Sequence, residues 1–236
     1  MNKICTIAKK ELAVYFRSPM AYIMLIITIS VFNIFFFMII DQNREATLKD
    51  VFLVMEFMFI FLIPLLTMRL FAEEKATGTM EFLMTTPTTN TAIVLGKYLG
   101  SLIFFTVIIL FSSVYYLIIE FYGAPDRMAV LGGFIGIWLE GAMFISIGMM
   151  VSSWTKSQTI AAVIAYMTLF LLYFSLSFVE YLSGRAETIV RTVSTMTHFA
   201  NFTAGLLTLA DVVYYLSIIF FCLMITRLSI EPRLWH

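Results

Sequence analysis

Long uncharged stretches alternate with short charged ones along the chain, and this alternation predicts its helices. No charged residue lies between Arg17 and Asp41, and a bilayer core about 30 Å thick needs about 20 apolar residues in a helix. By this criterion the spans that would cross a membrane are residues 19–40, 51–71, 97–120, 129–151, 158–180 and 211–228. We therefore predict an all-α integral membrane protein with six transmembrane helices in a single domain.

Residues 1–18 show a different helical pattern. At 100° per residue the apolar side chains fall on one side and the basic ones, among them Lys9 and Lys10, on the other, while Glu11 alone intrudes on the apolar side. This pattern predicts an amphipathic helix that lies on the inner membrane surface with its bases toward lipid phosphates. Such an elbow helix is either a plain anchor or also a contact for a cytosolic partner, with Glu11, Lys9 and Lys10 as the candidate residues.

Residues 181–210 interrupt the alternation of spans. The part from 192 to 210 carries no carboxylate, lysine or arginine, yet Asn201 and Gly205 break an already weak apolar run. We expect re-entrant or surface helices on the outer side, because such backbone inside a membrane survives only against protein or water. A seventh full span is the alternative.

Basic residues indicate the orientation, since cytosolic segments carry an excess of lysine and arginine. With the N-terminus inside, the outer segments hold only Arg44, Lys49, Arg127, Arg185 and Arg191. The other basic residues then lie in inner segments, so both termini and residues 72–96 are predicted to be cytosolic.

Composition supports the membrane class. The chain is 61% hydrophobic and only 13% charged, and its net charge of zero gives no indication of nucleic-acid binding. Cys5 and Cys222 both fall near the predicted cytosolic side, where a disulfide is not expected. Both are interpreted as ordinary apolar residues.

The most polar interruption, residues 72–96, predicts a structured cytosolic segment. Glu73 and Glu74 continue the preceding helix, Gly78 ends it, and Thr79 can cap a short new helix. That helix would carry Glu81, Phe82 and Leu83, would stop at Pro87, and would be followed by a helix that Asn90 can cap. Exposed apolar residues among carboxylates are typical of a docking surface. A simple connecting loop is the alternative, since short helices are often capped in this way.

Four stretches in order resemble the type-two ABC exporter permeases. The stretch "AEEKATGTMEFLMTTPTTNTAIVLGK" is similar to the family's cytosolic signature through Glu73-Glu74, Gly78-Thr79, Glu81-Phe82-Leu83, Pro87 and Gly96-Lys97. "KKELAVYFRSPMAYI" resembles its entry helix and "FISIGMMVSSWTKSQTIAA" its segment between spans four and five. "THFANFTAGLLTLADVVYYLS" is similar to the subgroup of gliding-motility and nitrous-oxide-reductase maturation permeases. Met84 with the following threonines and Glu140 depart from the family pattern.

The resemblance implies a permease subunit of the bacterial inner membrane that carries no cofactor and does not itself hydrolyse ATP. A separate cytosolic ABC ATPase would bind ATP and dock on the coupling residues Glu73, Glu74, Gly78, Thr79, Glu81, Phe82, Leu83 and Pro87. A second permease copy, identical or related, would complete the transporter, and an auxiliary outer-face subunit is a further partner. The sequence contains no G-x-x-x-x-G-K-[ST] motif, and Tyr98 follows Gly96-Lys97.

Few polar residues fall inside the predicted spans. Glu140 lies near the middle of one, where a carboxylate costs a few kcal/mol. It is either a protonated or hydrogen-bonded interhelical contact, for example with a tyrosine or serine, or a pathway-lining or proton-sensitive site. The glycines around it would allow close helix approach; they are Gly132, Gly133, Gly136, Gly141 and Gly148. Glu56 and Glu120 are interpreted as solvated ends, and His198 alone makes no metal site.

Two functions of other classes remain alternatives. One is a membrane enzyme. Against it, the polar residues form no recognisable nucleophile, acid–base or metal pattern, and no carboxylate pair lies with a histidine within one helix turn. A membrane scaffold or motility anchor would use an ATPase stroke without solute export. Co-purification with an ATPase whose turnover depends on this chain distinguishes the transporter from the scaffold.

Overall fold

The computed structural model describes residues 3–43, 47–80, 88–181 and 183–231. Within these ranges the regular elements are helices, and six of them are long and apolar enough to cross a membrane. These spans are Pro19–Gln42, Lys49–Thr77, Asn90–Tyr122, Arg127–Ser152, Gln158–Val179 and Leu209–Ile230. The prediction of an all-α membrane protein with six spans is therefore confirmed.

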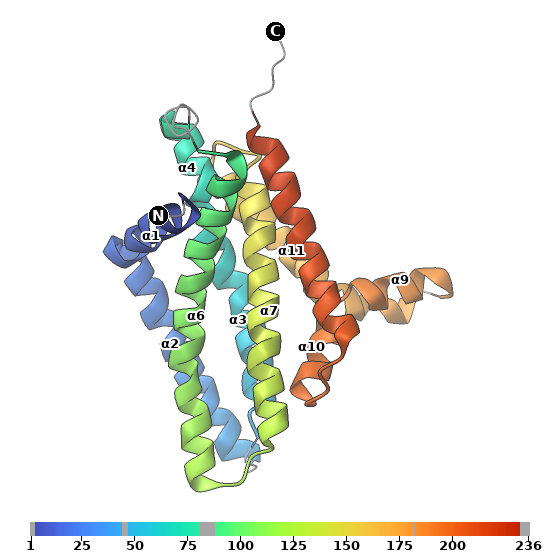
Figure 1. Cartoon of the computed structure of the whole chain (residues 1–236). Coiled ribbons are helices and arrows are strands. Elements are labelled where there is room, and N and C mark those ends of the chain that lie inside the picture. Colours follow the sequence, from blue (N-terminus) through green and yellow to red (C-terminus); the bar gives the residue numbers. More distant parts are fainter. Residues whose placement is uncertain (1–2, 44–46, 81–87, 182, 232–236) are drawn as a thin grey trace.

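Figure 1 shows the long helices packed side by side in one bundle. In chain order they are α1 (Lys3–Arg17), α2 (Pro19–Asn43), α3 (Lys49–Thr67), α4 (Arg69–Thr77), α6 (Asn90–Tyr122), α7 (Arg127–Ser152), α8 (Gln158–Phe174), the 3-10 turn η1 (Ser175–Tyr181), α9 (Arg185–Val193), α10 (Thr195–Thr203) and α11 (Leu209–Ile230). α6 has 33 residues, which makes it about 50 Å long. It therefore exceeds a bilayer core of about 30 Å and must extend beyond it.

Helix α7 is the centre of the bundle, and its glycines allow other helices to approach it. A side chain on Gly133 would overlap the Phe52 ring of α3, and one on Gly141 would overlap the Phe105 ring of α6. A side chain on Gly136 would likewise overlap Phe202 of α10. The predicted close approach through these glycines is confirmed, and large aromatic rings fill the space that the missing side chains leave.

The amphipathic helix α1 lies across the end of α6 (Figure 1). A Cβ atom on Gly96 would lie 2.6 Å from Ile7 Cβ, and one on Gly100 would lie 2.7 Å from Glu11 Cβ. Because real Cβ atoms do not approach so closely, these two glycines permit the contact. The buried face of α1 consists of Ala8, Glu11 and Tyr15.

The segment between the last two spans forms two short helices. α9 and α10 have nine residues each, which is too short to cross a bilayer, so the alternative of a seventh span is wrong. α9 buries none of its residues and projects sideways from the bundle, whereas α10 packs against α7 (Figure 1). The segment thus combines a surface helix with a helix that the bundle covers.

Candidate functional site

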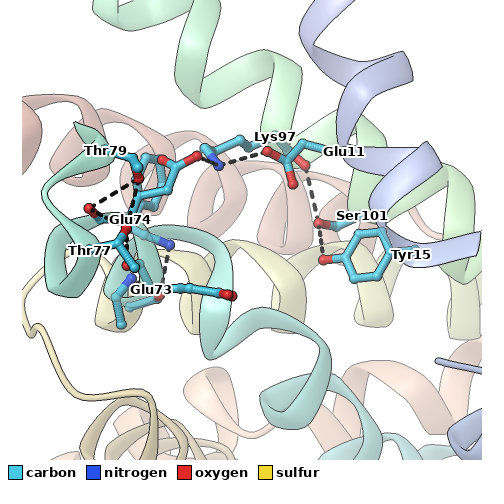
Figure 2. A network of polar contacts seen from close by, with 11 residues as sticks. Glu11, Tyr15, Glu73, Glu74, Thr77, Thr79, Lys97 and Ser101 are labelled. Atoms are coloured by element: carbon cyan, nitrogen blue, oxygen red, sulfur yellow. Dashed lines mark hydrogen bonds and ion pairs between the residues drawn. The ribbon is translucent and has the colours of Figure 1, made fainter. Parts of the chain in front are cut away.

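A buried ion cluster joins three helices at the end of the bundle where α1 lies (Figure 2). The Lys97 ammonium group of α6 lies 2.7 Å from Glu11 Oε1 of α1 and 2.8 Å from Glu74 Oε1 of α4. The Lys97 side chain is only 2% exposed. It also lies 5.4 Å from the centre of the Phe71 ring, so an aromatic face covers part of the ammonium group.

A second contact fixes α1 beside this cluster. The Tyr15 hydroxyl donates to the Leu66 carbonyl oxygen at 3.1 Å and lies 3.0 Å from Ser101 Oγ. The Ser101 hydroxyl in turn donates to the Lys97 carbonyl oxygen. Burial raises the pKa of Tyr15 above its ordinary value, which keeps the hydroxyl protonated as a donor. The elbow helix is therefore bound to both α3 and α6.

Helix α4 is attached to the end of α7. The Ser152 hydroxyl accepts from the backbone N–H groups of Phe71 and Ala72 at 3.1 Å and donates to the Met68 carbonyl oxygen at 2.9 Å. One hydroxyl thus satisfies backbone groups at the junction of α3 and α4, which would otherwise be buried without partners. The Lys75 ammonium group donates to the Ser153 carbonyl oxygen.

Gly78 ends α4 in the left-handed conformation, with φ of 71°. A residue with a side chain adopts this conformation only at a cost, so glycine suits this helix end. The Thr77 hydroxyl donates to the Glu73 carbonyl oxygen at 2.9 Å, and it lies 2.9 Å from Thr79 Oγ1. The predicted helix end at Gly78 is confirmed.

A cleft between α1 and α4 exposes one side of the ion cluster. It is lined by Lys10, Glu11, Val14, Arg69, Leu70, Glu73, Glu74, Thr77, Thr79 and Lys97. Among the described residues, Glu74 Oε2 has no hydrogen-bond partner. That oxygen is itself buried, so the groups that the cleft offers to another chain are the exposed side chains of Glu73, Thr77 and Thr79, which suit a basic group.

The structure brings together residues that the sequence placed far apart. Lys10 and Glu11 line the same cleft as Glu73, Glu74 and Thr79. Lys9 is exposed on α1, and Gly78 lies at the end of α4. Four of the predicted coupling residues, Glu81, Phe82, Leu83 and Pro87, lie outside the described residues.

Two details differ from the sequence interpretation. Glu11, a candidate contact for a cytosolic partner, is buried in an ion pair with Lys97 of the same chain, so it supports the fold. The cap of α6 is Thr89, whose side-chain oxygen accepts from the Ala92 N–H, and Asn90 is the first helical residue. The sequence reasoning also gave no role to Ser101, for which a serine inside an apolar run was the only signal, and placed Tyr15 merely on the apolar side of its helix.

A separate pair of carboxyl groups lies inside the bundle. Glu56 of α3 is fully buried and Glu140 of α7 is 1% exposed, and the two carboxyl groups lie near enough to influence each other. The interpretation of Glu56 as a solvated end is therefore wrong. The neighbour of Glu140 across the helices is Glu56, where we named a tyrosine or serine as an example, and neither carboxyl group has a hydrogen-bond partner among the described residues. The pair could not be recognised from one helix because its members lie on two.

A polar cluster holds α10 against the start of α11. Asp211 accepts from Asn201 Nδ2 at 3.0 Å and from the Thr208 hydroxyl at 2.5 Å, and its Oδ1 lies 2.6 Å from His198 Nδ1. The His198 ring stacks on Tyr214 at 4.0 Å. Within the described ranges no group of three or more His, Cys, Asp or Glu side chains could hold a metal ion.

Comparisons with known proteins place these features in a family. A search of curated proteins found no match to the chain. Residues 5–219 match the family described as ABC-2 family transporter protein. This range contains nearly all of α1, the ion cluster, the cleft and the first half of α11. The chain belongs to the ABC-2 type transporter permeases, a family of multi-pass transmembrane subunits of ABC transporters.

Proposed function

We propose that this chain is the export permease through which a separate cytosolic ABC ATPase acts, with residues 72–96 as the coupling segment. The observation that carries the proposal is the double contact of Lys97 with Glu11 and Glu74. It joins the helix that leads into the coupling segment to the helix that leaves it. A push on the segment would therefore reach both.

The contacts around α4 indicate how a movement of the coupling segment is transmitted to the other helices. α3 and α4 are nearly continuous through Met68, which keeps a helical backbone. Lys97 connects α4 to α6 and α1, and Ser152 connects α4 to α7. We infer that nucleotide-driven closure of the ATPases moves these helix ends as one rigid body, in the manner of other domain rotations.

The coupling residues have distinct roles in this proposal. Glu73, which is exposed, receives basic groups of the ATPase, and Glu74 holds Lys97 beside it. Gly78 and Thr79 fix the direction in which the chain leaves α4. Glu81, Phe82 and Leu83, with Pro87 as the stop, form the part inserted into the ATPase, as the family resemblance implies. Lys9 and Lys10 bind lipid phosphates beside it.

A second permease copy, identical or related, completes the proposed transporter. The outer faces of α2, α8 and α11 carry large exposed apolar side chains, such as Ile26, Leu171 and Phe220. These faces suit lipid tails and a second copy. The excess of basic residues at the α1 end supports a cytosolic location of both termini in a bacterial inner membrane. The gliding-motility-type subgroup and an auxiliary outer-face subunit remain predictions.

Crosslinking to the co-purified ATPase tests this proposal. In a Cys5→Ser/Cys222→Ser background, a cysteine at Thr79, which is exposed in the cleft, should crosslink to the ATPase. The yield of the crosslinked product should change when ATP is added. A cysteine at Tyr122, which is 84% exposed at the other end of α6, is the control and should not. Crosslinking from Tyr122 alone would overturn the proposal. A Thr79 crosslink without any effect of this chain on ATP turnover would favour the scaffold.

A further inference from the structure

The carboxyl pair of Glu56 and Glu140 is used by nothing in the proposed coupling mechanism. Both side chains are at least 99% buried, and all four of their oxygen atoms lack hydrogen-bond partners within the described chain. They come from α3 and α7, the two helices whose ends are attached to α4. Buried polar atoms without partners are rare in folded proteins and need an explanation.

Two further unpartnered hydroxyl groups face this pair. Thr195 of α10 and Tyr215 of α11 are fully buried, and neither Thr195 Oγ1 nor the Tyr215 hydroxyl has a partner among the described residues. Thr195 lies near the Glu140 carboxyl group, and the electrostatic influence of Glu140 and Glu56 reaches Tyr215. Four helices thus contribute one unsatisfied polar group each to the same buried region.

The charges around the pair require a bound proton. Two neighbouring carboxylates do not both ionise in an apolar interior. In the described chain no lysine or arginine contacts either group. The other titratable groups that face the pair are Tyr173 from α8, Tyr214 and Tyr215 from α11, and, through Tyr215, Asp211. None of them supplies a positive charge.

Two polar rows connect the pair to the His198–Asp211 cluster. Thr195 and His198 are three residues apart on α10, and Tyr215 and Asp211 are four apart on α11, so each couple shares one helix face. The rows meet where His198 Nδ1 lies 2.6 Å from Asp211 Oδ1. The His198 side chain is 15% exposed, so this end of the rows reaches the surface. Chains of carboxylates and histidines are typical of proton pathways in transporters.

We propose that Glu56 and Glu140 form a proton-binding site that exchanges its proton with the surface at His198, by way of Thr195 and Tyr215. Each ring nitrogen of His198 faces an acceptor, Asp211 Oδ1 or the Thr192 carbonyl oxygen, so the ring can hold both protons. In the exchange the O–H bond of the protonated carboxyl group breaks, an N–H bond forms on His198, and the ring releases a proton to solvent. The reverse step breaks an N–H bond of the imidazolium and forms an O–H bond on a carboxylate of the pair. No oxidant, reductant or metal ion takes part.

The proton site does not depend on the proposed ATPase coupling. The bound proton can be detected on the purified chain. Infrared spectra of the full-length protein in lipid nanodiscs at neutral pH should show the carbonyl band of a buried protonated carboxyl group. The double variant Glu56→Gln/Glu140→Gln should lose the band, and Glu187→Gln, on the exposed helix α9, should keep it. Absence of the band in the unaltered protein, or its loss on addition of NaCl or CaCl₂, would overturn the proposal, the second result in favour of a metal site.

The pathway is tested by the rate at which this band shifts in D₂O. His198→Gln should slow the exchange by about 100-fold, the lower end of what a positioned proton donor contributes. Tyr215→Phe removes a hydroxyl that has no partner, so it should fold normally and also slow the exchange. Arg191→Gln on α9 is the control and should leave the rate unchanged. Exchange as fast in both Tyr215→Phe and His198→Gln as in the unaltered chain would contradict the pathway.

Discussion

At the scale of single residues, the most informative side chain is the buried lysine of α6. Lys97 contacts two carboxylates from helices that are distant in sequence. Burying charges is costly, and the attraction within a buried pair repays the cost only when the geometry is good. Such a cluster is therefore weak evidence of stability alone, but removal of its centre leaves two carboxylates together without a counter-ion. Specific connection of α1, α4 and α6 is what the cluster provides.

Replacement of this lysine tests that connection. Lys97→Met should lower the free energy of unfolding by about 3–5 kcal/mol, because both carboxylates lose their partner. Glu11→Gln and Glu74→Gln should each cost less in the Lys97→Met background than in the unaltered chain. Denaturation in detergent measures these changes. Glu73→Gln, on the exposed neighbour of Glu74, is the control, and strictly additive effects would contradict a shared cluster.

Ser152 offers a second test at this scale. Ser152→Ala removes the acceptor of the Phe71 and Ala72 N–H groups, and buried groups without partners cost about 1–3 kcal/mol. Hydrogen exchange should show faster exchange of these two amides. Thr168→Ala, where an exposed hydroxyl bonds only its own helix, should leave them unchanged. Equal protection of the amides in the Ser152 variant would show that another group satisfies them.

At the scale of elements, α1 and α6 illustrate how small residues decide an arrangement. Gly96 and Gly100 lie one turn apart on α6 and leave a surface against which α1 rests. This arrangement places Glu11 and Tyr15 beside Lys97 and Ser101. A larger residue on that surface would separate the helices and open the ion cluster.

Alanine at these glycines should therefore disturb α1 specifically. Gly96→Ala and Gly100→Ala should each destabilise the protein by about 1–3 kcal/mol through overpacking, and should raise the rate at which a thiol reagent modifies a cysteine at the buried Tyr15 position. Leu99→Ala, at an exposed position of the same helix, is the matched control. Unchanged reactivity in both glycine variants would mean that α1 rests on other contacts.

The sequence predicted the elements better than their contacts. Spans follow from runs of apolar residues, which local composition determines, and the helix end at Gly78 follows from its backbone preference. The pairing of Glu56 with Glu140 and of Glu11 with Lys97 depends on how helices rotate against one another, which no single stretch encodes. Glu11 was the one polar residue on the apolar side of its helix, and that exception was the signal of a buried partner.

At the scale of the whole molecule, the account depends on which side of the membrane each end of the bundle faces. The α1 end carries the ion cluster, the cleft and most of the basic residues. The opposite ends of α6 and α7 carry the exposed Glu120–Arg127 ion pair at 2.6 Å. The proposed coupling requires the α1 end to be cytosolic.

Labelling of whole cells with a membrane-impermeant thiol reagent tests the orientation. In the background without native cysteines, a cysteine at Tyr122 should react in intact cells. A cysteine at Thr79, and the native Cys5 when restored, should react only after the membrane is opened, because both are exposed at the predicted inner side. The reverse pattern would place the cleft outside and exclude an ATPase contact there.

The most direct test of the central claim is a distance measurement in the complex with the ATPase. Spin labels at Lys10 and Thr79, which line the cleft on α1 and beyond α4, report whether these parts move together, and labels at Thr79 and Leu209 report movement against α11. The account predicts that ATP changes the Thr79–Leu209 distance and leaves the Lys10–Thr79 distance unchanged. A change of the Lys10–Thr79 distance as large as that of the other pair would contradict it.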